Sequence, residues 1–244
     1  FDPPLVLPDG EGYLSFRPKP ECFMSQPLDA LTKSLLQAAK TAGADSADAK
    51  AIRATSVSVD VRAGALEQAE RSEGVDIGLR VFVGQRQACV SASDTKPETL
   101  TQMAERAVAM AKEAPEDPFA GLSTEAELSD ARGAEGLELS DPTAEPEPSA
   151  LQDDAMRAEA AALAQSGISQ VQSASGGYSA REIHISATNG FSGGYKRTDR
   201  ATSCVAIAGT NADMERDYDG DSRTWLFNTV NRRFHYRLPP QGIG

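Results

Sequence analysis

Hydrophobic and polar residues alternate with two different periods along this chain, and each period predicts a different element. Hydrophobic residues recur at helical spacing from Leu28 to Ala38, preceded by Ser25 as a helix cap and by Pro27 in the first turn. Gly43 follows at a position where a left-handed residue commonly ends a helix. The sequence therefore predicts an amphipathic helix between Ser25 and Gly43.

After this helix the period changes to two, which is typical of half-buried strands. Valine alternates with polar residues over Val57–Val61, and Gly64 marks a turn. A second alternation covers Ile77–Val83, and the pair Gly84–Gln85 then fits a tight hairpin that leads into Ala88–Val90. These segments predict three or four strands of an antiparallel-rich sheet.

A second helix is predicted after these strands. Thr95 and Glu98 have the spacing of a capping box, and Pro115 and Pro118 end the helical pattern. Its apolar stripe consists of Leu100, Met103, Ala107, Met110 and Ala111. The order of helix, strands and helix predicts a two-layer α+β domain over residues 24–122, with the helices on one face of the sheet.

Residues 123–149 are acidic and rich in proline, which predicts an extended linker because like charges repel and little apolar surface can be buried. A third helix follows, with an apolar side made of Ala155, Met156, Ala160, Leu163 and Ala164. Beyond it, alternating residues around Ile183 and Val205 flank Asn189–Gly190, a strong signal for a type I′ hairpin. We interpret residues 150–224 as the start of a β-rich second domain.

Both ends of the chain lack these patterns. Residues 1–23 show no periodicity and precede the first methionine, Met24, so we interpret them as a non-native or disordered leader. Residues 225–244 become basic and aromatic, which leads us to expect a divergent tail from a truncated gene or a shifted reading frame.

Charge and cysteine content narrow the class of protein. The formal net charge of -12 disfavours binding to nucleic acid or to an anionic membrane. No run approaches the roughly 18 apolar residues of a membrane span, and the start lacks the features of a signal peptide. Three cysteines, Cys22, Cys89 and Cys204, lie far apart and form no C-x-x-C pair. These features predict a cytoplasmic protein.

No complete catalytic or metal-binding motif is present. His184 and His235 are the two histidines, and neither belongs to an H-E-x-x-H pattern, so we predict no zinc site in this chain. His184 alternates with isoleucines and is expected to face solvent or a neighbouring strand. Gly190–Gly194 matches G-x-S-x-G, but its strand-like flanks favour a hairpin over a nucleophile elbow at Ser192.

A series of carboxylates follows the first strand. Its members are Glu67, Glu70, Glu73 and Asp76. No glycine-pinned loop gathers them as in a calcium site, so a solvated strand face is the better interpretation. Arg62 and Arg80 are candidates to pair with these carboxylates across the sheet.

Four segments together resemble the PmbA/TldD family, and more specifically its PmbA-like branch. They are V-R-A-G-A-L-E-Q-A-E-R-S-E at Val61–Glu73, A-P-E-D-P-F-A-G-L at Ala114–Leu122, N-G-F-S-G-G-Y at Asn189–Tyr195 and M-E-R-D-Y at Met214–Tyr218. Each motif is soft, but their shared order within Leu28–Asp219 is specific.

The resemblance implies a bacterial metalloprotease system that acts on peptides or unfolded polypeptides in an enclosed cavity. In this family, TldD-type subunits carry zinc through a His-Glu pair and a second His, whereas PmbA-type subunits lack that motif. We therefore expect a truncated, non-catalytic subunit that is inactive alone, contains no cofactor, and forms a heterodimer with a zinc-bearing TldD-type partner.

Candidate residues for a peptide cleft or a subunit interface are Arg62, Arg80, Asn189, Gly190, Phe191 and Tyr195. Exposed strand edges beside the Asn189–Gly190 hairpin would take an extended peptide by main-chain hydrogen bonding. Two alternatives stay open: a protein-interaction module without any peptidase role, with the acidic linker as a tether, and a hydrolase that acts through Ser192.

Overall fold

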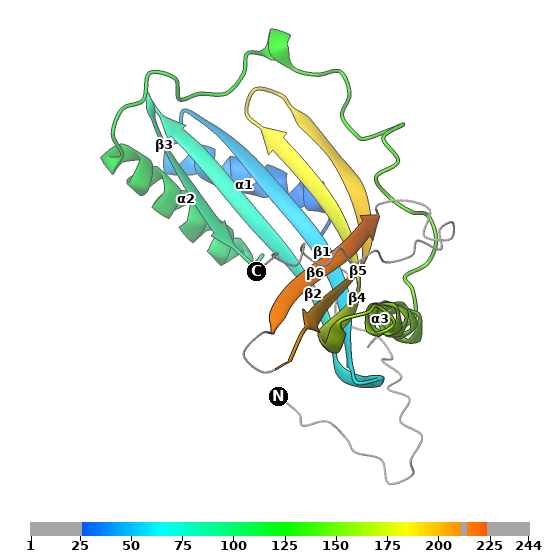
Figure 1. The fold of residues 1–244 in the computed structure, drawn as a ribbon. Helices are drawn as coiled ribbons and strands as arrows, with labels where there is room; N and C mark the ends of the chain where they lie inside the picture. The colour runs from blue at the N-terminus through cyan, green and yellow to red at the C-terminus, as the bar shows by residue number, and fades with distance from the viewer. Residues whose placement is uncertain (1–25, 211–213, 224–244) are drawn as a thin grey trace.

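The structure is a computed structural model, and it describes residues 26–210 and 214–223 (Figure 1). The predicted leader over residues 1–23 and the predicted tail over residues 225–244, with His235, lie outside these ranges. The helical elements are α1 (Leu28–Ala42), α2 (Pro97–Glu113), the short 3-10 helix η1 (Glu125–Glu127) and α3 (Pro148–Leu163). The strands are β1 (Ser46–Arg62), β2 (Ala65–Val83), β3 (Arg86–Ala92), β4 (Ile168–Ala187), β5 (Ser192–Ala208) and β6 (Glu215–Arg223).

All six described strands form one antiparallel sheet in the order β3-β2-β1-β4-β5-β6. The central strand β1 joins the two predicted domains, because Ala51 lies opposite Ile77 of β2 and opposite His184 of β4. The predicted α+β class is therefore confirmed, with the strands on both sides of residues 123–149 in a single sheet. The division into two domains stays a prediction.

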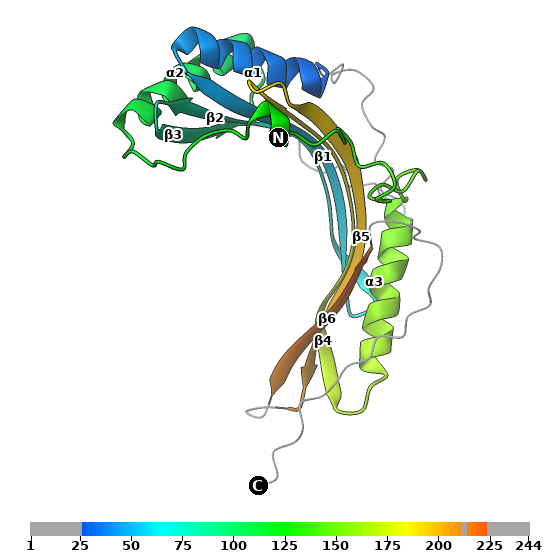
Figure 2. The same ribbon diagram turned by 90° about the horizontal axis from the view of Figure 1, so that it is seen from above.

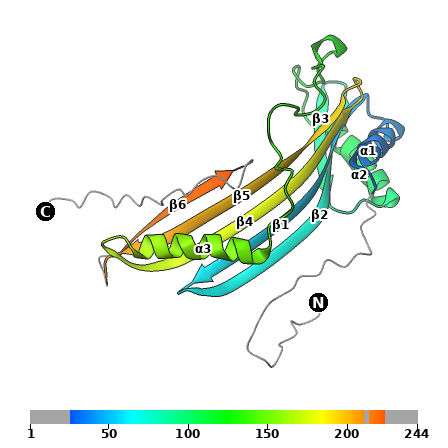
Figure 3. The same cartoon turned by 90° about the vertical axis from the view of Figure 1, so that its right-hand side faces the viewer.

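The sheet is strongly curled, and α1, α2 and α3 all lie on its convex face (Figure 2). On β1 the odd-numbered residues Ala47, Ala49, Val57 and Val59 are buried, whereas even-numbered residues such as Lys50 and Ser56 are exposed. Because side chains alternate between the faces of a strand, this pattern places every helix on the same side. Because its strands are long, the sheet extends from beneath α1 and α2 at one end to beneath α3 at the other (Figure 3).

In the described part of the chain, three clusters of buried residues lie beneath the helices, one under α1 and α2 and two that include residues of α3. Leu31 and Leu35 of α1 pack with Ile77 and Leu79 of β2 in the largest cluster, which also includes the buried side of α2. Under α3 the contacts involve smaller side chains, among them Ala155, Ala158, Ala162, Ala174 and Cys204. Small residues let helix and sheet backbones approach closely: a Cβ atom on Gly176 of β4 would lie 2.2 Å from the Leu151 carbonyl oxygen of α3.

The predicted capping box at the start of α2 is wrong. Lys96 is the cap residue, with extended backbone, because the residue before a proline is disfavoured in helical conformation and Pro97 is the first residue of the helix. The helix has no side-chain cap, and Asp94 instead holds the turn before it: its carboxylate accepts hydrogen bonds from the Lys96 amide at 3.2 Å and from Thr99 Oγ1 at 2.8 Å. These bonds lower the pKa of Asp94.

Candidate functional site on the concave face

The concave face of the sheet is the candidate functional surface, because no helix of the described residues covers it (Figure 2). The strand register places Ile52 of β1, Ile183 of β4 and Tyr195 of β5 side by side across this face. Ile185 extends the row along β4, and its side chain is 37% exposed, while Tyr195 is 38% exposed. Large apolar side chains thus lie open to solvent on a face that contributes nothing to the cores under the helices.

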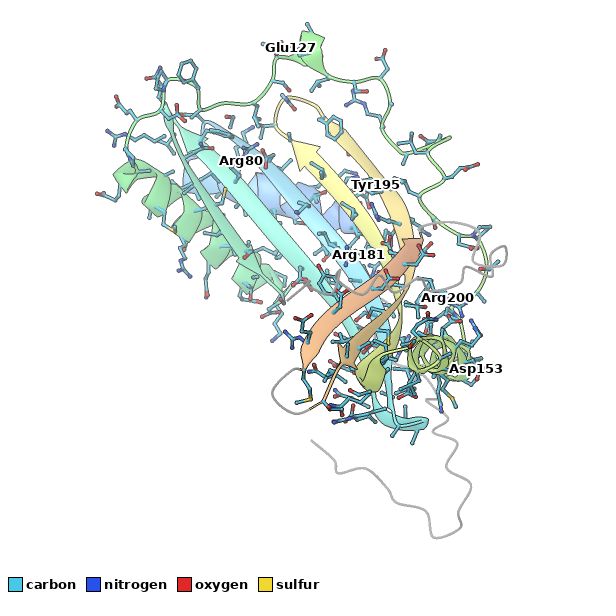
Figure 4. All side chains as sticks on the ribbon, viewed as in Figure 1. Arg80, Glu127, Asp153, Arg181, Tyr195 and Arg200 are labelled. Carbon is cyan, nitrogen blue, oxygen red and sulfur yellow. The ribbon has the colours of Figure 1, made fainter. Side chains whose placement is uncertain are left out.

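Basic side chains flank this apolar row. Lys50 lies opposite Ile185, and Arg181 lies opposite Ala54 on one side and Arg197 on the other. Lys50 and Arg181 are exposed and have no ion-pair partner among the residues that the structure describes. Figure 4 shows Arg181 and Tyr195 on the curled sheet.

Two other arginines on this face are each paired with a carboxylate. Arg197 pairs with Asp199 at 3.0 Å, and this hydrogen bond raises the pKa of Arg197. Arg80, a predicted candidate, pairs with Asp48 directly across β1 and β2, and its guanidinium lies 5.1 Å from the centre of the Phe82 ring. Arg80 therefore shares the concave face with Tyr195 but is already bound to a carboxylate.

Arg62 lies apart from the other candidates. It is the last residue of β1, at the end of the strand remote from Asp48, and its guanidinium is 3.5 Å from Glu67. Both side chains are about half exposed. The predicted pairing of an arginine with the carboxylate series is confirmed for Arg62 and Glu67, whereas Arg80 pairs with Asp48 instead.

Asn189 and Gly190 lie with Thr188 in the turn between β4 and β5, and Phe191 closes it, which confirms the predicted hairpin. Gly190 has a φ of 93°, but Asn189 is not among the residues with positive φ, so the predicted type I′ turn is wrong. A turn that is one residue longer replaces it, closed by hydrogen bonds from Gly190 N to Ala187 O and from Ala187 N to Phe191 O. The role of Asn189, Gly190 and Phe191 in a cleft or interface stays a prediction.

The same turn holds the segment that follows α2. Asn189 Nδ2 donates to the Ser123 carbonyl oxygen at 2.9 Å, and the Arg132 guanidinium lies 4.9 Å from the centre of the Phe191 ring. A Cβ atom on Gly193 would lie 2.3 Å from the Arg132 carbonyl oxygen. A glycine is therefore required at this position for the two backbones to approach.

The predicted linker covers part of the β5 edge. Gly194 N donates to Arg132 O at 2.8 Å and Thr198 N donates to Leu139 O at 2.9 Å, so two outward amides of β5 are already bonded. No sequence pattern predicted these contacts, because they involve backbone atoms of an irregular segment. A peptide that pairs with this stretch of β5 would have to displace residues 132–139.

A polar cluster that no sequence pattern predicted lies beneath α1 on the convex face. Thr32 Oγ1 is 3.0 Å from His184 Nδ1 and 3.0 Å from Ser186 Oγ, and Ser192 Oγ is 3.4 Å from His184 Nε2. Burial lowers the pKa of His184, and the nearby Asp29 carboxylate opposes this shift. Both ring nitrogens are used, so His184 links the helix to the sheet.

The cluster does not have the architecture expected for a serine hydrolase. Ser192 stands at the start of a strand after a hairpin turn, whereas a nucleophile elbow needs a strand, a sharp turn and a helix. The second nitrogen of His184 meets a threonine hydroxyl rather than a carboxylate that would orient the ring. The hairpin interpretation of the G-x-S-x-G match is the one that fits this geometry.

The described residues do not supply a zinc-binding set. No group of three or more His, Cys, Asp or Glu side chains in residues 26–210 and 214–223 could hold a metal ion. His184, the histidine within these ranges, is hydrogen-bonded through both nitrogens. None of the helices in this part of the chain combines the length and hydropathy required to cross a bilayer.

Two models of known protein families match this chain. The model of PmbA/TldA metallopeptidase domain 1 matches residues 47–111, and that of the PmbA/TldA metallopeptidase central domain matches residues 141–234. The chain belongs to the PmbA/TldD family. The predicted resemblance is confirmed.

Individual relatives agree with this assignment to the PmbA/TldD family. Metalloprotease PmbA of Escherichia coli O157:H7 is 29% identical over 234 residues, which cover 88% of this chain and 51% of that protein. The chain thus spans about half the length of this curated relative.

Two solved structures share the fold. A candidate modulator of DNA gyrase from Bacteroides thetaiotaomicron matches with a TM-score of 0.73 and 18% identity, covering 82% of this chain and 46% of that chain. TldE from Thermococcus kodakarensis matches with a TM-score of 0.62 and 17% identity, covering 80% and 43%. At these identities the likeness supports the fold alone.

Proposed function

We propose that this PmbA/TldD-family chain is a non-catalytic, PmbA-like subunit of a zinc-dependent peptidase that acts on peptides or unfolded polypeptides. In this proposal a TldD-type partner subunit holds the zinc, and this chain forms part of the wall of the cavity that receives the peptide. The observation that carries the proposal is the uncovered concave face, where Ile52, Ile183 and Tyr195 are aligned on a chain of this family.

In this division of labour, the partner subunit supplies the metal ligands. Zinc peptidases need imidazole and carboxylate ligands that converge on one ion, together with an activated water. The concave face offers apolar contact and charge instead, which suits holding a substrate. Cytoplasmic location is part of the proposal, since Cys89 and Cys204 are free thiols, as is usual in a reducing compartment.

The test is co-expression of the full chain with a TldD-type subunit, followed by affinity purification and a proteolysis assay on an unfolded polypeptide. We expect a complex whose activity exceeds that of either subunit alone. Chelation of zinc should abolish proteolysis and leave this chain's binding of peptide intact, because the metal would belong to the partner.

A matched pair of variants assigns the result to the concave face. Ile183→Ser should reduce proteolysis by the complex, whereas Ala180→Ser, three positions earlier on the same strand but on the convex face, should leave it unchanged. A chain that binds no TldD-type subunit and adds nothing to proteolysis would favour the alternative, an interaction module without a peptidase role.

A further inference from the structure

We infer that the concave face selects peptide segments in which an apolar side chain lies between two carboxylates, and this inference rests on the proposed peptide-holding function. It names the class of substrate that the surface recognises. The inference comes from the arrangement of the apolar row and of Lys50 and Arg181 around it, two cations without an ion-pair partner in the described part of the chain.

The two cations lie on opposite sides of the isoleucine pair. Ile52 is directly opposite Ile183; Lys50 is two residues from Ile52 on β1, and Arg181 is two residues from Ile183 on β4. Since β1 and β4 are antiparallel, Lys50 and Arg181 extend from this pair in opposite directions along the strands. An apolar centre therefore has one positive charge on each side.

The spacing of these cations matches an extended peptide. Lys50 lies opposite Ile185, which is four residues from Arg181, so their backbone positions are about 14 Å apart at strand geometry. Residues i and i+4 of an extended peptide are about 13 Å apart and point to the same side, with i+2 between them. A segment of the form Glu-x-Leu-x-Glu would therefore bring both carboxylates to cations and its leucine to the isoleucines.

The surface beside Lys50 is open to such a segment, because its neighbour on β2 is Gly78 and no side chain rises there. Beside Ile52, the Asp76 carboxylate accepts a hydrogen bond from Ser93, and beside Ile185 the Arg132 backbone lies over Gly193. The segment would therefore lie along β1 and β4, between these two flanks. Charge complementarity favours an acidic ligand: within residues 26–210 and 214–223, Lys50 and Arg181 have no ion-pair partner, although the whole chain has a net charge of -12. That overall field repels long polyanions, whereas a short acidic-apolar peptide experiences chiefly the local cations.

The experiment measures binding of labelled peptides to the full chain by fluorescence anisotropy. The probe is Ser-Glu-Ser-Leu-Ser-Glu-Ser, and it is compared with analogues in which glutamine or lysine replaces both glutamates. We expect the glutamate peptide to bind roughly three- to tenfold more tightly than the glutamine analogue at low salt, as two exposed ion pairs would give. This advantage should shrink at high salt because exposed charges are screened.

Variants locate the effect on this face. Arg181→Gln and Lys50→Gln should each remove part of the preference for glutamate and leave binding of the glutamine peptide unchanged. Lys40→Gln is the matched control, because Lys40 is an exposed cation in the last turn of α1, on the convex side. Thermal unfolding of each variant verifies that the fold is retained.

The possible outcomes separate this inference from the proposed function. Equal binding of the three peptides would overturn the inference and leave the peptide-holding role intact, whereas binding of none would overturn both. Tighter binding of an RNA oligonucleotide at the same face would also overturn it. If a TldD-type subunit displaces the peptide and Arg181→Gln weakens that subunit's association, the face is a subunit contact instead.

Discussion

Thr32 Oγ1 on α1 lies 3.0 Å from His184 Nδ1 on β4, which joins the first helix to a strand 152 positions away along the chain. The Thr32 hydroxyl also donates to the Asp29 carbonyl oxygen at 3.0 Å. With the Thr32 proton directed to Asp29, the Thr32 oxygen accepts from His184, which corresponds to the tautomer protonated at Nδ1. Nε2 is then free to accept a hydrogen bond from Ser192 at 3.4 Å.

Removing the Thr32 hydroxyl should weaken the attachment of α1 to the sheet. In Thr32→Val the shape is kept, but His184 and the buried Ser186 each lose a partner. We expect the free energy of unfolding to fall by about 1–3 kcal/mol, as measured by urea denaturation. Thr41→Val on the exposed side of the same helix is the control and should change it by less than about 0.5 kcal/mol. Equal losses for both variants would contradict this role.

Stability should depend on pH through His184. Burial lowers its pKa in the folded chain below the ordinary value of 6.5, so the unfolded chain binds the proton first as the pH falls. The free energy of unfolding therefore decreases as the pH drops from about 7 toward 5. Carboxyl groups with lowered pKa, such as that of Asp29, contribute only at lower pH, near and below their ordinary value of 3.8.

The measurement compares denaturation of the wild type and of His184→Gln at pH 7, 6 and 5. We expect the pH dependence between 7 and 5 to be smaller in the variant, because glutamine does not titrate. Histidine at position 235 is present in both chains and cancels in the difference. Parallel curves for the two proteins would show that His184 does not titrate in this range.

The contact between α3 and β4 depends on one glycine. A Cβ atom on Gly176 would lie 2.2 Å from the Leu151 carbonyl oxygen, whereas the same atom on Gly177 would lie 3.8 Å from the Val57 oxygen. Gly176→Ala should therefore lower the free energy of unfolding by about 2–3 kcal/mol through forced displacement of α3. Gly177→Ala should have an effect below about 1 kcal/mol, and denaturant titrations of the pair test this difference.

The turn between β1 and β2 contains a strained alanine. Ala63 has a φ of 53° and Gly64 a φ of 74°, which together form the two-residue turn that favours Asn-Gly. The Gly64 amide donates to the buried Glu159 carboxylate of α3 at 2.8 Å, which holds the turn in place. We expect Ala63→Asn to raise the free energy of unfolding by roughly 0.5–1 kcal/mol, since asparagine tolerates the left-handed region.

Thermal and urea denaturation measure this gain, and Ala65→Asn provides the comparison. Ala65 is the first residue of β2, where asparagine is disfavoured, so that variant should be neutral or destabilised. A stabilisation of similar size in both variants would mean that the backbone conformation at Ala63 is not its cause.

Local patterns predicted several elements of this fold correctly, but the apolar side predicted for α3 is wrong, because Met156, Ala160, Leu163 and Ala164 are exposed. Gly43 has a φ of 98° and ends α1 as expected, and the Gly84–Gln85 pair connects β2 to β3. Met110 was assigned to the buried stripe of α2 but is 44% exposed. The other residues of that stripe are buried because α1 and the sheet cover them. The sequence period alone does not show which residues of α2 lie beyond the edge of this contact.

By itself the sequence determined the α+β class, the hairpins and the family, because periodicity, turn residues and motif order are local properties. Only the tertiary structure decided that one sheet continues from β2 through β1 to β4, and that α1, α2 and α3 all occupy its convex face. Strand pairing between distant segments depends on register, which brought His184 to Thr32 and aligned Ile52, Ile183 and Tyr195. No local pattern encodes such neighbours, since they arise when separate strands meet.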